Sequence, residues 1–244
     1  MRRADGRAVD ELRALSIEVD FTQNPLASVV CSMGRTKVLC TVTEELSVPR
    51  WLHGSGRGWL TAEYSLLPGS TDRRSEREAA RGKQSGRTLE IQRLIGRSLR
   101  AVVDLARLGE RTLWVDCDVL QADGGTRTAS ITGAWTALAI GVARLRARGS
   151  LAADPLTDSV AAISVGIVDG RVVLDLPYEE DARADVDMNV VATGKGRFVE
   201  VQGTAENGTF AATDLAQMTE MAQRAIAVLT EVQADAVSRA RPGP

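Results

Sequence analysis

The chain has few cysteines, a single histidine and no long hydrophobic run, and each shortage excludes a class of protein. Its three cysteines, Cys31, Cys40 and Cys117, lie in apolar stretches without a C-x-x-C pair, which indicates buried thiols in a reducing cytosol. The longest apolar run, 134–143, is far short of the ~20 residues that span a bilayer. Residues 1–7 have no apolar region of a secretory signal. We therefore expect a cytoplasmic protein without a membrane partner.

The motifs that the sequence lacks exclude several classes of enzyme and of metal site. His53 is the only histidine, so a two-histidine ribonuclease and a multi-histidine zinc site are excluded. His53 itself is expected to face solvent or to cap a turn. No G-x-S-x-G elbow for a hydrolase triad is present. Neither Gly82-Lys83 nor Gly194-Lys195 is followed by serine or threonine, so we do not expect a nucleoside-triphosphate P-loop.

Charge is distributed unevenly, although the net charge is only -2. Nine basic residues lie between positions 73 and 100 against three acidic ones, whereas acidic residues concentrate between 175 and 187. This balance excludes a basic coat over the whole surface but allows a local nucleic-acid-binding patch. Residues 68–86 are polar and basic without periodicity, which predicts a long loop that is functional or disordered.

The segment Gly124-Gly125-Thr126-Arg127 joins a predicted strand, 111–120, to a helix predicted from Thr126 to about Arg148. Glycines permit a tight turn with uncovered N–H groups, and the helix start adds N–H donors and the positive end of its dipole. The hydroxyl of Thr126 and the guanidinium of Arg127 make the segment suited to phosphate. The alternative is an ordinary turn in which Thr126 caps the helix.

A carboxylate cluster follows further along the chain. It comprises Asp175, Glu179, Glu180, Asp181, Asp185 and Asp187. Asp185 and Asp187 share one face of a predicted strand, and Asp181 lies on the turn before it. Carboxylates that converge without lysine partners repel one another, and a cation such as Mg²⁺ relieves that repulsion. A solvated acidic loop is the alternative, but an anion-binding turn and a magnesium-type cluster together point to phosphoryl transfer.

Hydrophobic periodicity predicts an alternation of hairpins and helices. Strands are predicted at 16–22, 28–33, 37–43, 58–67, 111–120, 160–168, 171–176, 185–193 and 198–204, and helices at 88–105, 126–148 and 213–237. Asp214 and Gln217 are expected to cap the last helix. Hairpins without strict β-α-β alternation predict an α+β fold of mixed sheets with packed helices. We expect a single domain over residues 1–244, with a frayed tail at about 239–244.

Four motifs in this order resemble those of the ribonuclease PH family. They are Arg3–Arg7, Ser85–Arg100, Asp116–Arg127 and Asp175–Val190. The resemblance extends from Arg2 to about Glu231. It implies a fold like the second domain of ribosomal protein S5, and phosphate-dependent 3′-to-5′ removal of nucleotides from RNA. The implied substrate is mainly the trailing end of precursor tRNA, with rRNA a further candidate, and the implied assembly is a homohexamer, a trimer of dimers.

The resemblance also assigns roles to residues. Arg87 resembles the family's phosphate-binding arginine, and Gly125, Thr126 and Arg127 its second phosphate-binding element. Inorganic phosphate is then a co-substrate.

Asp181 and Asp187 are similar in position to the catalytic aspartates of the family, which are associated with Mg²⁺ or a similar divalent cation. Asp185 is a weaker candidate in the same cluster. The RNA-contacting loop is implied to include Arg73, Arg74, Arg77 and Arg81.

Two other functions stay open on the sequence alone. A hydrolytic, metal-dependent exonuclease would use the same acids with water, but it would leave Arg87 and the 125–127 segment without a purpose. A non-catalytic ring subunit that only grips RNA would lack the acids or the phosphate arginine, and this chain retains both.

Overall fold

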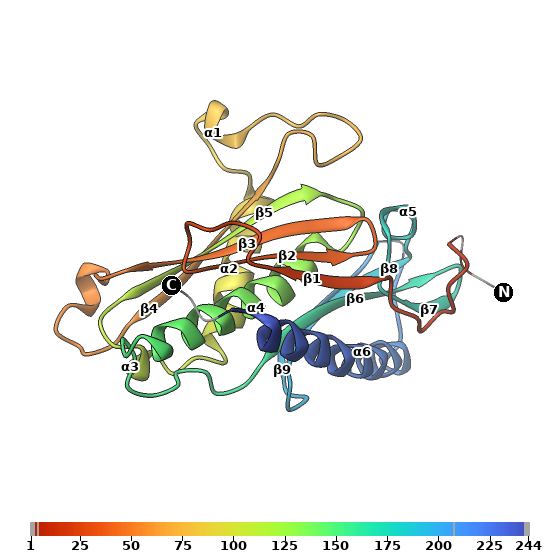
Figure 1. Cartoon of the computed structure of the whole chain (residues 1–244). Helices are drawn as coiled ribbons and strands as arrows, with labels where there is room; N and C mark the ends of the chain where they lie inside the picture. Colours follow the sequence, from red (N-terminus) through yellow and green to blue (C-terminus); the bar gives the residue numbers. More distant parts are fainter. Residues whose placement is uncertain (1–2, 4, 207, 242–244) are drawn as a thin grey trace.

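Two β-sheets and three long helices make up the structure, a computed structural model that describes residues 3, 5–206 and 208–241 (Figure 1). The first sheet has the strand order β1-β2-β3-β5-β4, in which β4 and β5 are parallel and the other pairs antiparallel. Its strands are β1 (Leu15–Val19), β2 (Ala27–Met33), β3 (Thr36–Glu45), β4 (Trp59–Leu66) and β5 (Thr112–Gln121). This mixed sheet confirms the predicted α+β class.

The second sheet is antiparallel throughout, in the order β7-β6-β8-β9. Its strands are β6 (Val160–Val168), β7 (Arg171–Leu174), β8 (Val186–Thr193) and β9 (Phe198–Ala205). The long helices are α2 (Gly86–Arg100), α4 (Thr126–Ala147) and α6 (Ala212–Arg239). Short ones are η1 (Arg50–Leu52), α1 (Glu78–Arg81), α3 (Leu105–Leu108) and α5 (Tyr178–Asp181).

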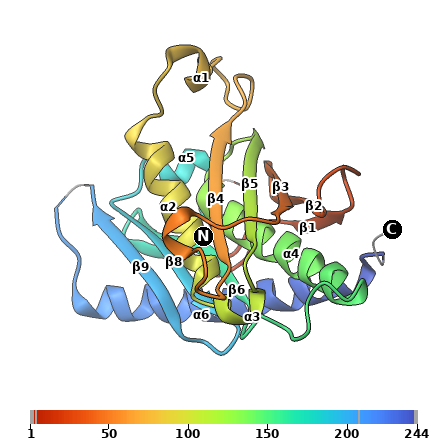
Figure 2. The same ribbon diagram turned by 90° about the vertical axis from the view of Figure 1, so that its left-hand side faces the viewer.

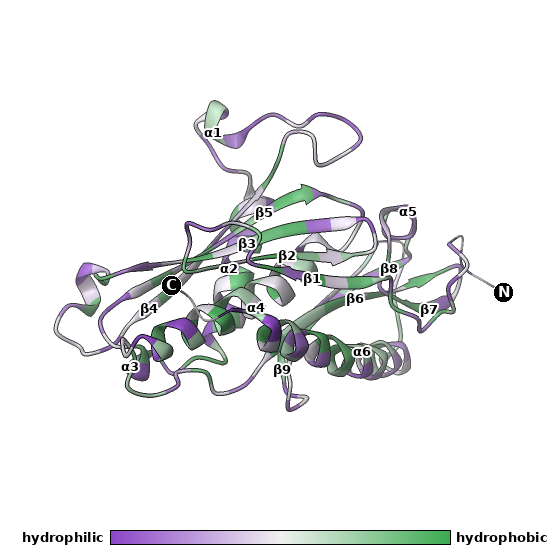
Figure 3. Cartoon of the chain, in the orientation of Figure 1, coloured by the Kyte–Doolittle hydropathy of each residue, from purple (hydrophilic) through white to green (hydrophobic). Residues whose placement is uncertain are grey.

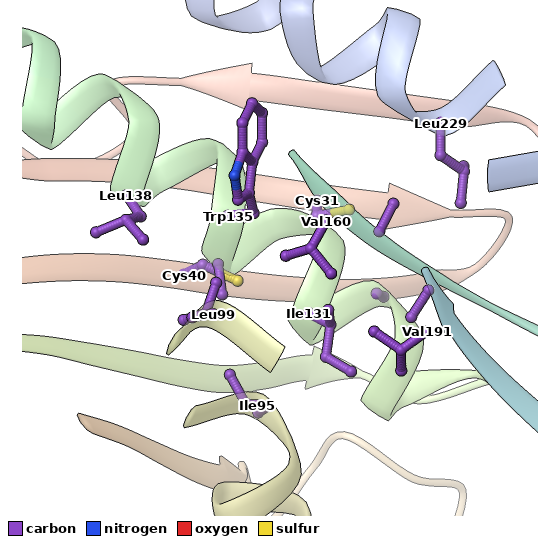
Figure 4. Close-up of a cluster of buried hydrophobic side chains, with 14 of the residues drawn as sticks. Cys31, Cys40, Ile95, Leu99, Ile131, Trp135, Leu138, Val160, Val191 and Leu229 are labelled. Carbon is purple, nitrogen blue, oxygen red and sulfur yellow. The ribbon is translucent and has the colours of Figure 1, made fainter. Parts of the chain in front are cut away.

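The core surrounds α4, which packs on β2 and β3 of the first sheet and on β6 of the second. Ile131 and Trp135 of α4 gather in one buried cluster with Cys31 and Cys40 of the first sheet and Val160 of the second (Figure 4). Many apolar residues lie along the strands and along α4 and α6 (Figure 3). One buried cluster therefore includes residues of both sheets and of α2, α4 and α6, although the single domain over 1–244 stays a prediction.

The elements differ from the expected ones at several boundaries. The predicted helix 88–105 ends at Arg100, and Asp104 caps a separate helix, α3, by accepting from the N–H groups of Ala106 and Arg107 at 3.0 and 3.4 Å. The short helices α1 and α5 lie within segments predicted as loop and turn, because neither is long enough to show a period.

The last helix also departs from its prediction. Ala211 is its N-cap, and the Asp214 carboxylate accepts from the Ala211 N–H at 2.9 Å, so Gln217 takes no part in the cap. The helix continues to Arg239, beyond the predicted end at 237, and Arg239 pairs with Asp235 at 2.9 Å; the frayed tail stays a prediction. Residues 242–244 of the predicted tail lie outside the described residues.

The cysteines and the histidine lie as expected. All three cysteines are free and buried. The His53 ring is exposed, and its Nε2 lies 2.8 Å from the Val48 carbonyl oxygen. Within the described ranges, no helix combines the length and the apolar character needed to cross a membrane.

Close packing of α4 on the first sheet generates a stability prediction. A Cβ added at Gly133 would lie 2.8 Å from both Cys31 Cβ and Cys40 Sγ, so Gly133→Ala forces the helix and sheet apart. We expect it to lower the free energy of unfolding by about 1–3 kcal/mol, measured by thermal unfolding at fixed protein concentration.

Gly141→Ala is the matched control in the same helix. Its Cβ would meet the end of the Leu26 side chain at 3.2 Å, which can shift, and alanine favours the helix by about 1 kcal/mol. Equal stability of the two variants would show that the packing at Gly133 does not constrain α4.

Candidate active site

The first element of the site is the N-terminus of α2. Ser85 caps this helix by accepting from the Thr88 N–H at 3.1 Å. Glu78 of α1 accepts from the Thr88 hydroxyl at 2.8 Å and from the Ser85 N–H at 3.1 Å, so α1 is tied to the same turn. Arg87 in this first turn is exposed and has no hydrogen bond or ion pair within the described part of the chain.

The second element is the turn that opens α4. Gly124 and Gly125 have φ values of 73° and 66°, and a Cβ at Gly124 would lie 2.5 Å from the Leu176 carbonyl oxygen. Glycine is therefore required by both conformation and space. The N-cap is Gly125, so Thr126 is not the cap of the alternative interpretation.

Hydrogen bonds decide which groups of this turn remain free. The Thr128 hydroxyl donates to the Gly125 carbonyl at 2.8 Å. Thr36 secures the turn, donating to the Gly124 carbonyl at 2.6 Å and accepting from the Asp123 N–H at 2.9 Å. The Thr126 hydroxyl lies 2.8 Å from the Tyr64 hydroxyl, and phosphate binding by Thr126 and Arg127 stays a prediction.

The third element carries the two aspartates. Asp181 ends α5, and Asp187 lies near the start of β8, opposite Gly166 and Thr204. Burial raises the pKa of Asp181. Burial, and then the charge of Asp181, raise the pKa of Asp187 to about 6. Asp187 Oδ1 is buried and has no hydrogen-bond partner among the described residues.

Opposite charges face one another across these three elements. The charges of Arg87 and Arg127 both lower the pKa of Asp181 and Asp187, although burial outweighs them. No ion pair joins either arginine to either aspartate in the described residues; Arg127 instead donates to Gln202 Oε1 at 2.8 Å and lies 3.5 Å from Glu90 Oε1. The structure thus brings together the predicted residues Arg87, Gly125, Thr126, Arg127, Asp181 and Asp187, with no ion pair between the two arginines and the two aspartates.

Part of the predicted carboxylate cluster is already neutralised. Asp175 is buried and forms a 2.6 Å ion pair with Arg13, and Glu180 is buried against Arg3. The expectation that these acids lack partners was wrong, because the N-terminal segment supplies arginines rather than lysines. Asp175 and Glu180 are therefore structural groups.

Asp185 stays a weaker candidate, while an acid that was not predicted acts on both aspartates. The Asp185 backbone binds Ile167 and Glu206 at 2.8 and 3.0 Å, and the charge of Glu206 raises the pKa of both Asp181 and Asp187. Glu206 follows β9, and only the β8–β9 register brings it near. No local sequence signal identifies it.

The basic loop lies apart from these groups. The segment with α1 projects beyond the first sheet in both views (Figures 1 and 2), and its arginines are exposed: Arg73, Arg74, Arg77 and Arg81. Arg81 pairs with Glu76 at 2.5 Å. Arg77 lines a hollow with Asp116 and Asp118, and its charge lowers the pKa of Asp118 against the raising effect of burial. RNA binding by this loop remains a prediction.

Comparison with known proteins assigns the chain to a family. Residues 11–142 match the model of the 3′ exoribonuclease family, domain 1, and residues 158–225 match domain 2 of that family. The chain belongs to the 3′ exoribonuclease family.

Close relatives support this placement over nearly the full length. The chain is 57% identical over 237 residues to ribonuclease PH of Corynebacterium diphtheriae, covering 97% of this chain and 98% of the relative. It is 54% identical over 241 residues to ribonuclease PH of Bacillus subtilis, covering 98% of each. The chain is therefore an enzyme, a phosphorolytic 3′-to-5′ exoribonuclease, as the motif resemblance implied.

Solved structures share the fold. An Archaeoglobus fulgidus exosome with RNA bound to the active site has a TM-score of 0.79 at 20% identity, covering 94% of this chain and 92% of that chain. An archaeal exosome core has a TM-score of 0.73 at 20% identity, covering 96% and 91%. These structures confirm the ribonuclease PH type of fold.

The raised pKa of Asp187 generates a pH-dependent prediction. The pKa of Asp187 is higher in the folded chain than its ordinary value of 3.8. The charged carboxylate therefore destabilises the folded chain fully above about pH 6, and this destabilisation is absent below pH 3.8. In metal-free buffer at about pH 8, we expect Asp187→Asn to raise the free energy of unfolding by roughly 1–3 kcal/mol. The gain should vanish below about pH 4.

Unfolding curves across this pH range check the prediction, with exposed Asp235→Asn on α6 as the control. Added Mg²⁺ should stabilise the wild type more than Asp187→Asn. A variant that is less stable than wild type at pH 8 would contradict the assignment of Asp187 as an uncompensated buried charge.

Proposed function

We propose that Arg87, Thr126 and Arg127 hold inorganic phosphate, and that Asp181 and Asp187 act at the scissile bond of an RNA 3′ end. The observation that carries this assignment is the pair of arginines that faces the pair of aspartates without forming an ion pair with them. Opposite charges that are not paired with one another suit a ligand that has an anionic part for the guanidinium groups and a part that the carboxylates bind.

The geometry supports phosphorolysis by positioning. Phosphate must approach an anionic phosphodiester, so its charge has to be neutralised while its oxygen is aimed at the scissile phosphorus. Two guanidinium groups and the N–H groups of the α4 N-terminus supply fixed donors, and a fixed orientation lowers the entropic part of the barrier. Attack forms a nucleoside diphosphate and leaves a shortened RNA with a free 3′ hydroxyl. One phosphoester is broken and one phosphoanhydride is formed, so nucleotidyl transfer to RNA 3′ ends is the reverse reaction.

The two aspartates suit a divalent cation that takes only some of its ligands from the protein. The described residues contain no group of three or more His, Cys, Asp or Glu side chains arranged to hold a metal. Mg²⁺, however, is commonly held by one or two carboxylates together with water and substrate phosphate. The unpartnered Asp187 Oδ1 and the raised pKa of both acids suit that role. Mg²⁺ held by Asp181 and Asp187 would supply charge neutralisation at the reacting phosphate oxygens.

The substrate and assembly follow from the family. We infer precursor tRNA as the main substrate and rRNA as a further one, and a homohexamer built as a trimer of dimers. The relatives' name and the exosome with RNA bound to its active site support RNA as the ligand. Three buried free thiols support a reducing compartment such as the cytoplasm. A hydrolytic exonuclease is disfavoured, because it would have no use for the exposed, unpaired Arg87.

Arg87, Thr126 and Arg127 form the proposed phosphate clamp, and removing Arg87 tests it. A charge-assisted hydrogen bond is worth about 1.5–3 kcal/mol, so Arg87→Ala should raise the phosphate concentration for half-maximal rate at least tenfold, while RNA affinity changes little. The measurement is phosphate titration with identification of the released mononucleotides. Arg224→Ala, which removes an exposed arginine of α6, is the control, and an unaltered phosphate dependence in Arg87→Ala would refute the clamp.

The basic loop yields a separate prediction. Replacing Arg73, Arg74 and Arg77 together with alanine should weaken precursor tRNA binding and flatten its salt dependence, because fewer counterions are released. Phosphorolysis of a short single-stranded RNA should persist.

A triple variant of exposed arginines elsewhere removes the same charge as a control: Arg107, Arg146 and Arg224. Equal loss on both RNA substrates would place the loop in the active site or a subunit interface, which size-exclusion chromatography of the same variant distinguishes.

A further inference from the structure

Tyr64 lies directly beneath the proposed phosphate-binding turn. It belongs to the inward face of β4, opposite Cys117 of β5, and is 2% exposed. Its hydroxyl oxygen is 2.8 Å from Thr126 Oγ1, at the first turn of α4. The charges of Arg87 and Arg127 both act on this phenol, so Tyr64 lies close to each group of the proposed clamp.

Either hydroxyl can donate in this hydrogen bond, and an anion bound at Thr126 decides between them. Thr126 is the hydrogen-bond partner of the Tyr64 hydroxyl within the described part of the chain. When an anion accepts the Thr126 hydroxyl proton, Thr126 Oγ1 is the acceptor left for the phenol, and a buried O–H that finds no acceptor costs about 1–3 kcal/mol, so the phenol donates to Thr126 Oγ1 in that state. Burial raises the pKa of Tyr64 above its ordinary value, and the phenol therefore keeps its proton at neutral pH.

With the phenol as donor, the Thr126 hydroxyl has its own proton available for the anion. This hydroxyl makes no hydrogen bond other than the one with Tyr64 among the described residues. Thr128, two residues later, differs, because its hydroxyl donates to the Gly125 carbonyl. Thr126 is therefore the hydroxyl of this turn with a proton free for a ligand.

We propose that Tyr64 is a positioning residue for phosphate: it donates to Thr126 Oγ1 and so directs the Thr126 hydroxyl proton toward the bound anion. This inference rests on the proposed function of the clamp. A donor that is fixed before phosphate arrives loses less rotational freedom on binding than a freely rotating hydroxyl. The contribution of Tyr64 should therefore appear in phosphate affinity rather than in RNA binding or turnover.

Tyr64→Phe tests the inference because it removes the hydroxyl and preserves the ring. We expect the phosphate KM to rise about threefold to tenfold, with kcat and the RNA KM within about twofold of wild type. Thr126→Val, which removes the acceptor and the donor together, should raise the phosphate KM at least as much. Thr126→Ser keeps the hydroxyl and should raise the phosphate KM less than Thr126→Val does.

A double variant separates positioning from general packing. In the Thr126→Val background, Tyr64→Phe should raise the phosphate KM no further, because its effect passes through the Thr126 hydroxyl. Full additivity, or an unchanged phosphate KM in Tyr64→Phe alone, overturns the positioning role. A parallel fall in kcat, RNA affinity and thermal stability also overturns it. If Thr126→Val and Arg87→Ala both leave the phosphate KM unchanged, the clamp itself is refuted.

Discussion

Burial of α4 between the two sheets is the constraint on which the active site depends. The helix is buried along most of its length, and Gly133 allows it to approach the first sheet more closely than any side chain would permit. Its first turn is therefore fixed relative to β4, which carries Tyr64, and to β6 and β8 of the second sheet, beside which the aspartates lie. A clamp that must hold phosphate in one orientation needs this rigidity, because small displacements of a reacting group are costly.

Buried ion pairs also fix the position of the segment that carries the aspartates. The Arg13 guanidinium binds the Asp175 carboxylate and also donates to the Asp123 carbonyl at 2.6 Å. It thereby joins the segment that precedes α5 to the turn that precedes α4. Arg3 adds a second tie to Glu180, adjacent to Asp181. Removing one partner of such a buried pair typically costs about 3–5 kcal/mol, so the N-terminal segment helps to define the active site without reaching the substrate.

The sequence was sufficient for local structure and for the residues that lie in motifs. The strands and the long helices followed from periodicity, and the glycine turn pointed to Thr126 and Arg127 because glycine pairs and helix starts have local signatures. Interactions between distant segments were not predictable in this way. Asp175 looked like a metal ligand because its partner, Arg13, lies 162 residues away. Glu206 and Tyr64 reach the site only through strand register, which periodicity alone does not fix.

The arginines and the aspartates of the site lie near one another without pairing, and this arrangement costs folding free energy. A protein optimised for stability alone would close the distance between Arg87 or Arg127 and the aspartates, lowering both carboxyl pKa values. Instead, burial dominates, and the pKa of Asp187 rises to about 6. Three rigid features keep the arginines and the aspartates apart: the glycine turn, the Arg13–Asp175 pair and the β8 backbone. Under the proposed assignment, phosphate at the arginines and a cation at the carboxylates would satisfy both sides at once. Binding energy is then available where the reacting groups meet, which is where it lowers the barrier.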